Sequence, residues 1–396
     1  MRDYSYAEVA DRLRMLSRQQ EGSDCGVTAR TVWRWEHGTR PLARYRRLLC
    51  ALYDASSEDL GFRVTQAHAR PEVDARVVGS QLARISPSTT PVAGRAGVEP
   101  VLQAFRAADR QVGGGYLYGA AIRYLTCEVE PQLGTSAPAA FAAAAALTEM
   151  AGWMAHDAGH DRLAQRHFDR ALRLASSAGD VELIAHIHAS VSHLAQHTGR
   201  AHEALQLAQM GADLLRRKEH GPAIAARLHA MQARALASLG QRSECGRMLL
   251  AAERTLDRRA CQAPSPWVSP FDHASLAGEA SQCMEQLRQF TAAGQHSERA
   301  ISLRGSGHVR SRAFSQLRLA NILATQGEID HACAIAANAM ESTAQLSSHR
   351  VSQLLHSLYA KLLPHMAATG VDDAVAALSS ALAARVPAYL LIDTEA

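Results

Sequence analysis

Apolar side chains recur with helical spacing along nearly the whole chain, and this pattern changes twice. Between Tyr6 and about Leu52, short helical segments alternate with glycine-containing breaks. From residue 63 to 97 the helical pattern weakens and prolines accumulate among serines and threonines, which is typical of a linker. Beyond it the helical period continues almost to the end, and no run of alternating β-branched residues is long enough to predict a strand. The sequence therefore predicts an all-α protein.

One glycine context repeats within the long helical part of the chain. The glycines are Gly159, Gly199, Gly240, Gly278 and Gly327, at spacings of 40, 41, 38 and 49 residues. Five and twelve residues after each glycine stand mostly small residues, such as Ala164 and Ala171. The pattern predicts helix hairpins, in which the glycine ends the first helix and the small residues let the second helix pack closely. The long last spacing predicts an insertion or a partial repeat between Gly294 and Gly307.

With a glycine late in the first helix and a small residue twelve positions later, the pattern resembles the tetratricopeptide repeat over about residues 150 to 345. The resemblance implies an α-solenoid of stacked helix pairs. Pro264–Asp272, which contains Trp267 and Phe271, falls between two repeats. This segment is either a packed loop or an interaction edge.

The positive charge of the chain is concentrated near its N-terminus. The formal net charge is +4, but residues 28–50 hold six arginines against Glu36 alone, a local charge of +5. Contact with a polyanion requires such a localised basic segment. Seven cysteines, an odd number without a CxxC pair, favour reduced thiols over a disulfide framework. No apolar stretch is long enough to span a membrane, so we expect a cytoplasmic protein.

The basic segment contains a short helix with two different faces. Thr28 suits a helix N-cap and Gly38 suits a helix C-terminus, so the spacing predicts one helix between them. Val32 and Trp35 share a buried stripe. The opposite face then carries Ala29, Arg30, Trp33, Arg34 and His37. A short cationic helix of this kind can enter the major groove of DNA.

The segment Arg30–Pro41, RTVWRWEHGTRP, resembles the recognition helix and following turn of the Xre-type, lambda-repressor-like helix-turn-helix regulators. The resemblance implies that Tyr6–Leu13 is the supporting helix and that Pro41–Tyr53 closes a small bundle. It also implies that this part of the chain binds double-stranded DNA. The candidate DNA-binding residues are Thr28, Arg30, Thr31, Trp33, Arg34, His37, Arg40, Arg44, Arg46 and Arg47.

The predicted organisation is a small N-terminal helix-turn-helix head followed by a tetratricopeptide-like α-solenoid body. The expected parts are a helix-turn-helix domain at 1–62, a linker at 63–97, a helical connector at 98–150 and the repeat domain at 151–396. This plan favours a transcriptional regulator that forms homodimers and binds a peptide, small-molecule or protein effector on the concave side of its repeats. Candidate effector contacts are Arg318, Asn321 and Asn338, because side-chain amides can bind a peptide backbone. The alternative is a protein-interaction scaffold without specific DNA binding.

Other residue groups give weaker signals. The histidine trios His156, His160, His167 and His186, His193, His197 have helical spacings, but 19 histidines produce such spacings by chance, and packing is the simpler interpretation. Gly113–Gly115 has no preceding strand and no phosphate-loop motif, which favours a flexible helix connector. No catalytic motif or acid–base pair stands out. We therefore expect neither an enzyme nor a cofactor or metal site.

Overall fold

The computed structural model describes residues 4–21, 26–36, 41, 43–53, 55, 60, 95–135, 138–216, 220–258, 265–305, 307–344, 346–368 and 370–385. Every regular element in these ranges is helical, which confirms the predicted all-α fold. No helix among them is long and apolar enough to cross a membrane. The chain forms two compact units, Met1–Val73 and Asp74–Ala396. The expected linker, up to residue 94, lies outside the described residues.

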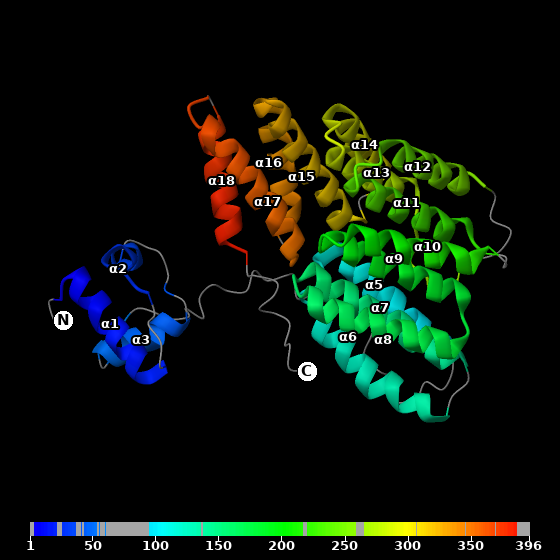
Figure 1. Ribbon diagram of the computed structural model, residues 1–396, viewed down its shortest axis with the longest axis horizontal. Coiled ribbons are helices and arrows are strands. Elements are labelled where there is room, and N and C mark those ends of the chain that lie inside the picture. Colours follow the sequence, from blue (N-terminus) through cyan, green and yellow to red (C-terminus); the bar gives the residue numbers. More distant parts are fainter. Residues whose placement is uncertain are drawn as a thin grey trace. The chain divides into compact units, whose positions relative to one another are not determined.

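The N-terminal unit is a small helical bundle. Its helices are α1 (Tyr6–Glu21), α2 (Ala29–Glu36) and α3 (Ala43–Tyr53) (Figure 1). Leu13, Val32 and Leu48, one from each helix, are buried together in its core. α2 begins as predicted, because the hydroxyl of Thr28 accepts a hydrogen bond from the amide of Thr31 at 3.3 Å.

α1 is longer than the sequence pattern predicts. It continues to Glu21 instead of ending near Leu13, and the buried face continues through Ser17. The connection between α1 and α2 is therefore short, since it covers only residues 22–28.

The second unit is a curved array of helix pairs, as the predicted repeats require (Figure 1). It begins with α5 (Arg95–Val112), α6 (Tyr118–Tyr124), the π-helical η1 (Leu125–Val129) and the 3₁₀-helical η2 (Glu130–Thr135). The pairs are α7 (Pro138–Asp157) with α8 (Asp161–Ala178), α9 (Val181–His197) with α10 (Ala201–Leu215), α11 (Pro222–Ser238) with α12 (Arg242–Leu256), α13 (His273–Gln286) with α14 (Phe290–Leu303), α15 (Val309–Gln326) with α16 (Ile329–Thr343), and α17 (His349–Leu362) with α18 (Val371–Ala383); η3 (Leu363–His365) follows α17. We call the first helix of each pair its A helix and the second its B helix.

Two helices of this unit begin earlier than predicted. α5 begins at Arg95, inside the segment expected to be a linker. α7 begins at Pro138, inside the expected connector, and it is the A helix of the first pair. Proline suits the first turn of a helix, because the amide that it lacks would have no helical partner there. The repeats therefore start about one helix before residue 151.

Four of the five repeat glycines end their A helices as predicted. Gly159, Gly199, Gly240 and Gly327 have φ angles between 74° and 91°, a left-handed conformation that favours glycine. Five and twelve residues after each of them, the predicted small residues are fully buried, with Ala164 of α8 as one example. Those positions are the contact face of the B helices.

The fourth turn is made by Arg288 and not by Gly278. Gly278 lies inside α13, whereas Arg288 occupies the left-handed position between α13 and α14 with a φ angle of 57°. The residues five and twelve positions after Arg288 are Ala293 and Ala300, and both are fully buried. The small-residue pattern therefore continues in this register, and the register based on Gly278 was wrong.

The extra residues of the irregular repeat precede α13. Gly294 lies within α14, so the insertion predicted from that residue onward is also wrong. The additional chain lies between α12 and α13, where Trp267 and Phe271 are buried. Arg106 of α5 donates a hydrogen bond of 2.6 Å to the carbonyl of Trp267. The described part of this segment is thus a packed loop.

The helix array closes on itself, because its first and last pairs are in contact. The carboxylate of Asp157, at the end of α7, accepts a hydrogen bond of 2.7 Å from the hydroxyl of Ser348. It also pairs with Arg310 of α15 at 3.2 Å. Next to this contact, the amide of Ser347 donates to the carbonyl of Val112 at 2.9 Å. The end of α5 and the start of α17 are therefore joined.

The glycine segment after α5 is close-packed, in contrast to the flexible connector predicted. Gly113 has a φ angle of 82°, and a Cβ atom there would lie 2.5 Å from the carbonyl oxygen of Ser347. A Cβ atom on Gly114 would lie 2.6 Å from the Cα atom of Met154. Only glycine lets the backbone approach α7 and α17 this closely.

Candidate functional site

The second unit contains a cavity of about 400 Å³. Its walls come mainly from the A helices α7, α9, α11, α13, α15 and α17, and α5 and residues 269–272 complete them. The volume lies within the range of about 300–1,000 Å³ that is usual for ligand sites. This lining by A helices is the arrangement expected of a concave effector surface in stacked helix pairs.

Arginine dominates the polar lining of this cavity. Seven arginines line it, against four carboxylates. Three of these arginines are ion-paired, and the pairs are Arg304 with Asp272, Arg310 with Asp109 and Arg318 with Glu285. Arg106, Arg110, Arg227 and Arg350 form no ion pair with a carboxylate of the described residues. The cavity therefore has an excess of positive charge.

Arg350 of α17 is the most unusual of these cations. Its guanidinium packs over the ring of Phe314, 5.2 Å from the ring centroid. Burial lowers the pKa of Arg350 to about 10, although the nearby carboxylate of Asp157 acts in the opposite direction. At neutral pH the side chain is still protonated. Arg350 is thus a half-buried, partly desolvated positive charge, and the nearby carboxylate of Asp157 is already bound by Arg310 and Ser348.

Arg227 of α11 is held in place by a buried polar network. It donates a hydrogen bond of 3.0 Å to the hydroxyl of Ser190, which in turn donates to the carboxylate of Glu149 at 2.7 Å. The indole of Trp153 donates to the same carboxylate at 2.6 Å. The network fixes the position of the Arg227 guanidinium, and the negative charge of Glu149 offsets part of the positive charge of Arg227.

The cavity also has apolar walls. Its apolar side chains include Met150, Trp153, Met231, Phe271 and Phe314. They come from α7, α11, α15 and the loop before α13. A ligand that fills the cavity can therefore bury apolar surface and also meet guanidinium groups.

The structure does not bring the three predicted effector contacts together. Arg318 lines the cavity, where it is paired with Glu285. Asn321 is buried, and its amide nitrogen donates to the carbonyls of Leu317 at 2.8 Å and Leu354 at 3.1 Å, which ties α15 to α17. Asn338 is exposed on α16 and is not part of the cavity wall.

In the N-terminal unit, α2 carries the first of the predicted DNA-binding residues. Val32 is buried and Trp35 packs against Tyr45, with 5.2 Å between the ring centroids. Arg30 is exposed, and Trp33 retains 46% of its side-chain exposure. The two faces of the predicted recognition helix are therefore separated as its periodicity indicated.

The remaining predicted DNA-binding residues are only partly described. Thr28 is exposed and Thr31 is half-buried. On α3, Arg47 is exposed and Arg46 is half-buried. Arg34 and Arg44 lie within α2 and α3, respectively, but their side chains are outside the described part of the structure, as are residues His37 and Arg40 altogether.

Comparison with known proteins assigns no family to this chain. No family model matches it, and no curated protein matches it. Among solved structures, the chain is similar to a Rap protein complexed with competence and sporulation factor. The two are 12% identical with a TM-score of 0.49, and the match covers 83% of this chain and 100% of that chain.

Proposed function

We propose that the second unit is a receptor for an anionic ligand, which binds in the arginine-lined cavity. The observation that carries this proposal is Arg350, a half-buried guanidinium in the cavity wall without a carboxylate partner among the described residues. Burying a charge without a partner is costly, and a bound carboxylate or phosphate group would offset that cost. Arg110 and Arg227 supply two further cations on the same wall.

The lining favours a ligand that is anionic at one point and apolar elsewhere. Met150, Met231 and Phe314 contribute apolar surface beside the arginines. A short peptide with an acidic side chain or a free C-terminal carboxylate combines both properties. A binding function of this kind agrees more directly with the helical-repeat fold than DNA binding does, because stacked helix pairs offer extended binding surfaces.

Peptide titrations of the full chain test this proposal. Fluorescently labelled tetrapeptides that combine glutamate with leucine serve as probes, and citrate and pyrophosphate serve as compact anions. Arg350→Gln should weaken binding about 10- to 100-fold, since a hydrogen bond to a charged group contributes about 1.5–3 kcal/mol. Arg242→Gln, at an exposed arginine of α12, is the matched control. Equal affinities for Arg350→Gln and the unmodified chain would contradict the proposal, and binding of citrate alone would identify a small-molecule ligand.

The second proposal is that the N-terminal unit binds double-stranded DNA. It is supported by the exposed side chains of Arg30 and Trp33 on the face of α2 opposite Val32. A short capped helix with such a face suits the major groove. Together the two proposals describe a ligand-responsive transcriptional regulator.

A gel-shift selection from genomic fragments tests the second proposal. We expect the full chain to retain specific fragments at physiological salt, and Trp33→Ala to reduce that retention. If the chain retains no fragment more tightly than random DNA, the protein is an interaction scaffold, and the receptor proposal is unaffected.

The DNA proposal also implies a homodimer, because a single small head makes too few contacts for useful specificity. Light scattering on the full chain should therefore give twice the monomer mass. A monomer at micromolar concentration would argue against a two-fold operator.

A further inference from the structure

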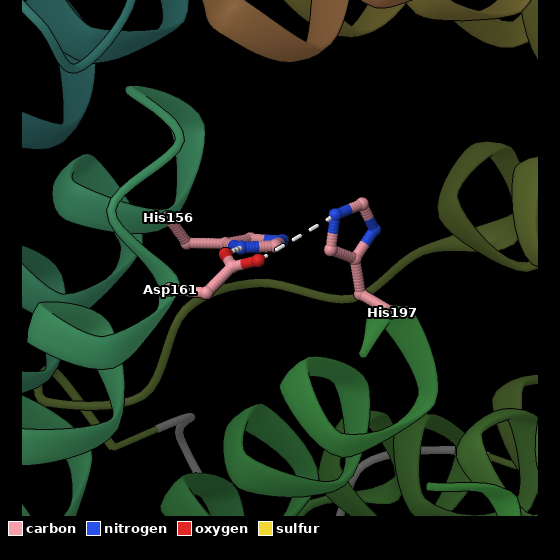
Figure 2. A group of neighbouring side chains, drawn as sticks. All are labelled: His156, Asp161 and His197. Atoms are coloured by element: carbon pink, nitrogen blue, oxygen red, sulfur yellow. Dashed lines mark hydrogen bonds and ion pairs between the residues drawn. The ribbon is translucent and has the colours of Figure 1, made fainter. Parts of the chain in front are cut away.

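One group of titratable side chains outside the cavity lies where α7, α8 and α9 meet. Figure 2 shows its three members, which are the imidazoles of His156 and His197 and the carboxylate of Asp161. Nδ1 of His156 donates a hydrogen bond of 2.6 Å to Asp161, because an ionised carboxylate can only accept. Since this nitrogen already holds Asp161, an ion on the opposite ring nitrogen of His156 could not bind the same carboxylate. The hydrogen bond therefore serves to join the end of α7 to the start of α8.

A second group consists of two thiols on neighbouring helices. Cys245 of α12 and Cys283 of α13 are fully buried, whereas the other three cysteines of the described residues keep part of their surface exposed. The two thiols are hydrogen-bonded to each other. They belong to one apolar cluster with Ala233, Leu236 and Ala237 of α11. Two groups of the same oxidisable chemistry are therefore in contact inside the fold.

Little movement separates this pair of thiols from a disulfide. The bond between two sulfurs is about 2.05 Å long, and it forms only where the backbones of the two cysteines lie close together. α12 and α13 pack against each other, and sulfurs that are already in contact approach further by side-chain rotation. We expect the bond to form without a rearrangement of the helices.

The thiol pair lies at the joint that contains the insertion. α12 ends at Leu256 and α13 begins at His273, and this is the longest connection between consecutive helix pairs of the described array. A bond between Cys245 and Cys283 would join the third and fourth pairs directly across it. Because α13 also supplies Gln282 to the cavity wall, the bond would tie a wall helix to its neighbour.

Cys245 is the better nucleophile of the two. It is the fourth residue of α12, and its amide closes the first helical turn on the carbonyl of Gln241 at 3.0 Å. The N-terminal end of a helix favours a thiolate. The hydrogen bond from Cys283 lowers the pKa of Cys245 although burial opposes this, and the same hydrogen bond, together with burial, raises the pKa of Cys283.

A small oxidant can reach Cys245 through the outer side of α12. The next residue, Gly246, is exposed, and a Cβ atom there would meet no heavy atom within 4 Å. The ends of helices open more readily than their middles. Hydrogen peroxide is small and uncharged, so a brief opening of this first turn admits it. We expect the reaction to be slower than at the exposed Cys127, because a buried thiol is inert until the turn opens.

We propose that Cys245 and Cys283 form a reversible disulfide when the protein meets hydrogen peroxide. The Cys245 thiolate attacks one peroxide oxygen, the O–O bond breaks, and hydroxide leaves as the sulfur becomes a sulfenic acid. The sulfur of Cys283 then attacks the sulfenic sulfur, so that an S–S bond forms, the S–O bond breaks, and the thiol proton leaves in water. In total, two thiols lose two electrons to one peroxide and give one disulfide and two waters. This site is independent of the proposed anionic ligand.

Peroxide treatment of the reduced full chain, followed by peptide mapping in a mass spectrometer, tests the site. After the remaining thiols are alkylated, trypsin should release Ser243–Arg247 joined to Ala260–Arg288. The second peptide contains both Cys261 and Cys283, and chymotrypsin separates them by cutting after Phe271. The bond should be found on Cys283, and dithiothreitol should release the two peptides.

Two variants make the result specific. Cys283→Ser removes the second thiol, so Cys245 should remain a sulfenic acid that dimedone labels. Cys333→Ser, at a half-buried cysteine of α16, is the matched control and should leave the linked peptides unchanged. Oxidation of the exposed Cys127 shows that the peroxide has acted. The proposal is overturned if Cys127 is oxidised while Cys245 and Cys283 remain thiols, if the bond joins Cys245 to another cysteine, or if dithiothreitol does not restore both thiols.

Discussion

Replacing Asp157 by alanine should lower the free energy of unfolding of the second unit by about 3–5 kcal/mol. The Asp157 carboxylate is almost fully buried, and it accepts hydrogen bonds from Ser348 at 2.7 Å and from the Gly114 amide at 3.3 Å. It also pairs with Arg310 at 3.2 Å. A buried hydrogen bond to a charged group contributes about 1.5–3 kcal/mol, so the two shorter contacts together contribute about 3–6 kcal/mol. Removing one partner of a buried ion pair costs about 3–5 kcal/mol, which lies within that sum. Arg310 keeps its second partner, Asp109, at 2.6 Å, so the variant does not leave Arg310 without a carboxylate.

Urea unfolding of the full chain, followed by far-ultraviolet circular dichroism, measures this loss. Asp213→Ala is the matched control, because Asp213 pairs with Arg216 at 2.7 Å while their side chains remain 58% and 76% exposed, respectively. An exposed pair of this kind contributes less than about 1 kcal/mol. Equal losses for the two variants would show that the contact between the first and last helix pairs is not the stabilising feature inferred from its geometry.

Three further outcomes are expected. Gly114→Ala should lower the free energy of unfolding by about 1–3 kcal/mol, because its Cβ atom would lie 2.6 Å from the backbone of α7. Gly246→Ala, in an open position on α12, is the control and should raise the free energy of unfolding by about 0.5–1 kcal/mol. Changes of the same sign for both variants in urea unfolding would refute the packing argument. Burial and two nearby arginines lower the pKa of His167 to about 4 in the folded protein, so the unfolded chain binds a proton at higher pH than the folded chain does. Thermal stability should therefore fall as the pH drops from about 6.5 towards 4. In melting curves, His167→Gln should flatten this pH dependence. In gel shifts, Arg34→Ala should remove specific DNA recognition, at a cost of about 1–3 kcal/mol of binding free energy. Arg46→Ala should instead weaken the binding of specific and of random DNA alike. If Arg34→Ala weakens the binding of both DNAs equally, Arg34 does not contact a base edge.

The repeat turns were largely predictable from the sequence, and the one failure has a simple physical cause. Glycine marks a turn that needs a left-handed backbone conformation, and Gly159, Gly199, Gly240 and Gly327 mark four of the turns in this way. At Arg288 the surrounding helices hold a non-glycine residue in that conformation, so no glycine marks the turn. The nearby Gly278 lies within a helix and shifted the predicted register.

Several residues that line the cavity lie at a fixed distance before the turn residues, but this pattern appears only when Arg288 is taken as the fourth turn. Nine positions before four of the five turn residues stand Met150, Met231, Glu279 and Arg318, and all four line the cavity; Ser190, nine positions before Gly199, does not. Arg350 has no such marker, because α5 and α17 complete the cavity only through contacts between distant parts of the chain. Side-chain type alone could not distinguish Asn321, which ties two helices together, from a residue that meets a ligand.

The contact between the first and last helix pairs changes how this solenoid is expected to fold. An open repeat array grows from local contacts between neighbouring repeats, and its ends fray independently. Here Ser348 meets Asp157 across 191 residues of sequence, and Arg310 meets Asp109 across 201. Closing loops of that length is entropically costly and slow, so we expect the ring to form late and to lock the repeats into one cooperative unit. A nascent chain that has not yet supplied α15 and α17 would expose the Asp157 carboxylate and the Gly114 amide, and it would lack a finished cavity until its last helices arrive.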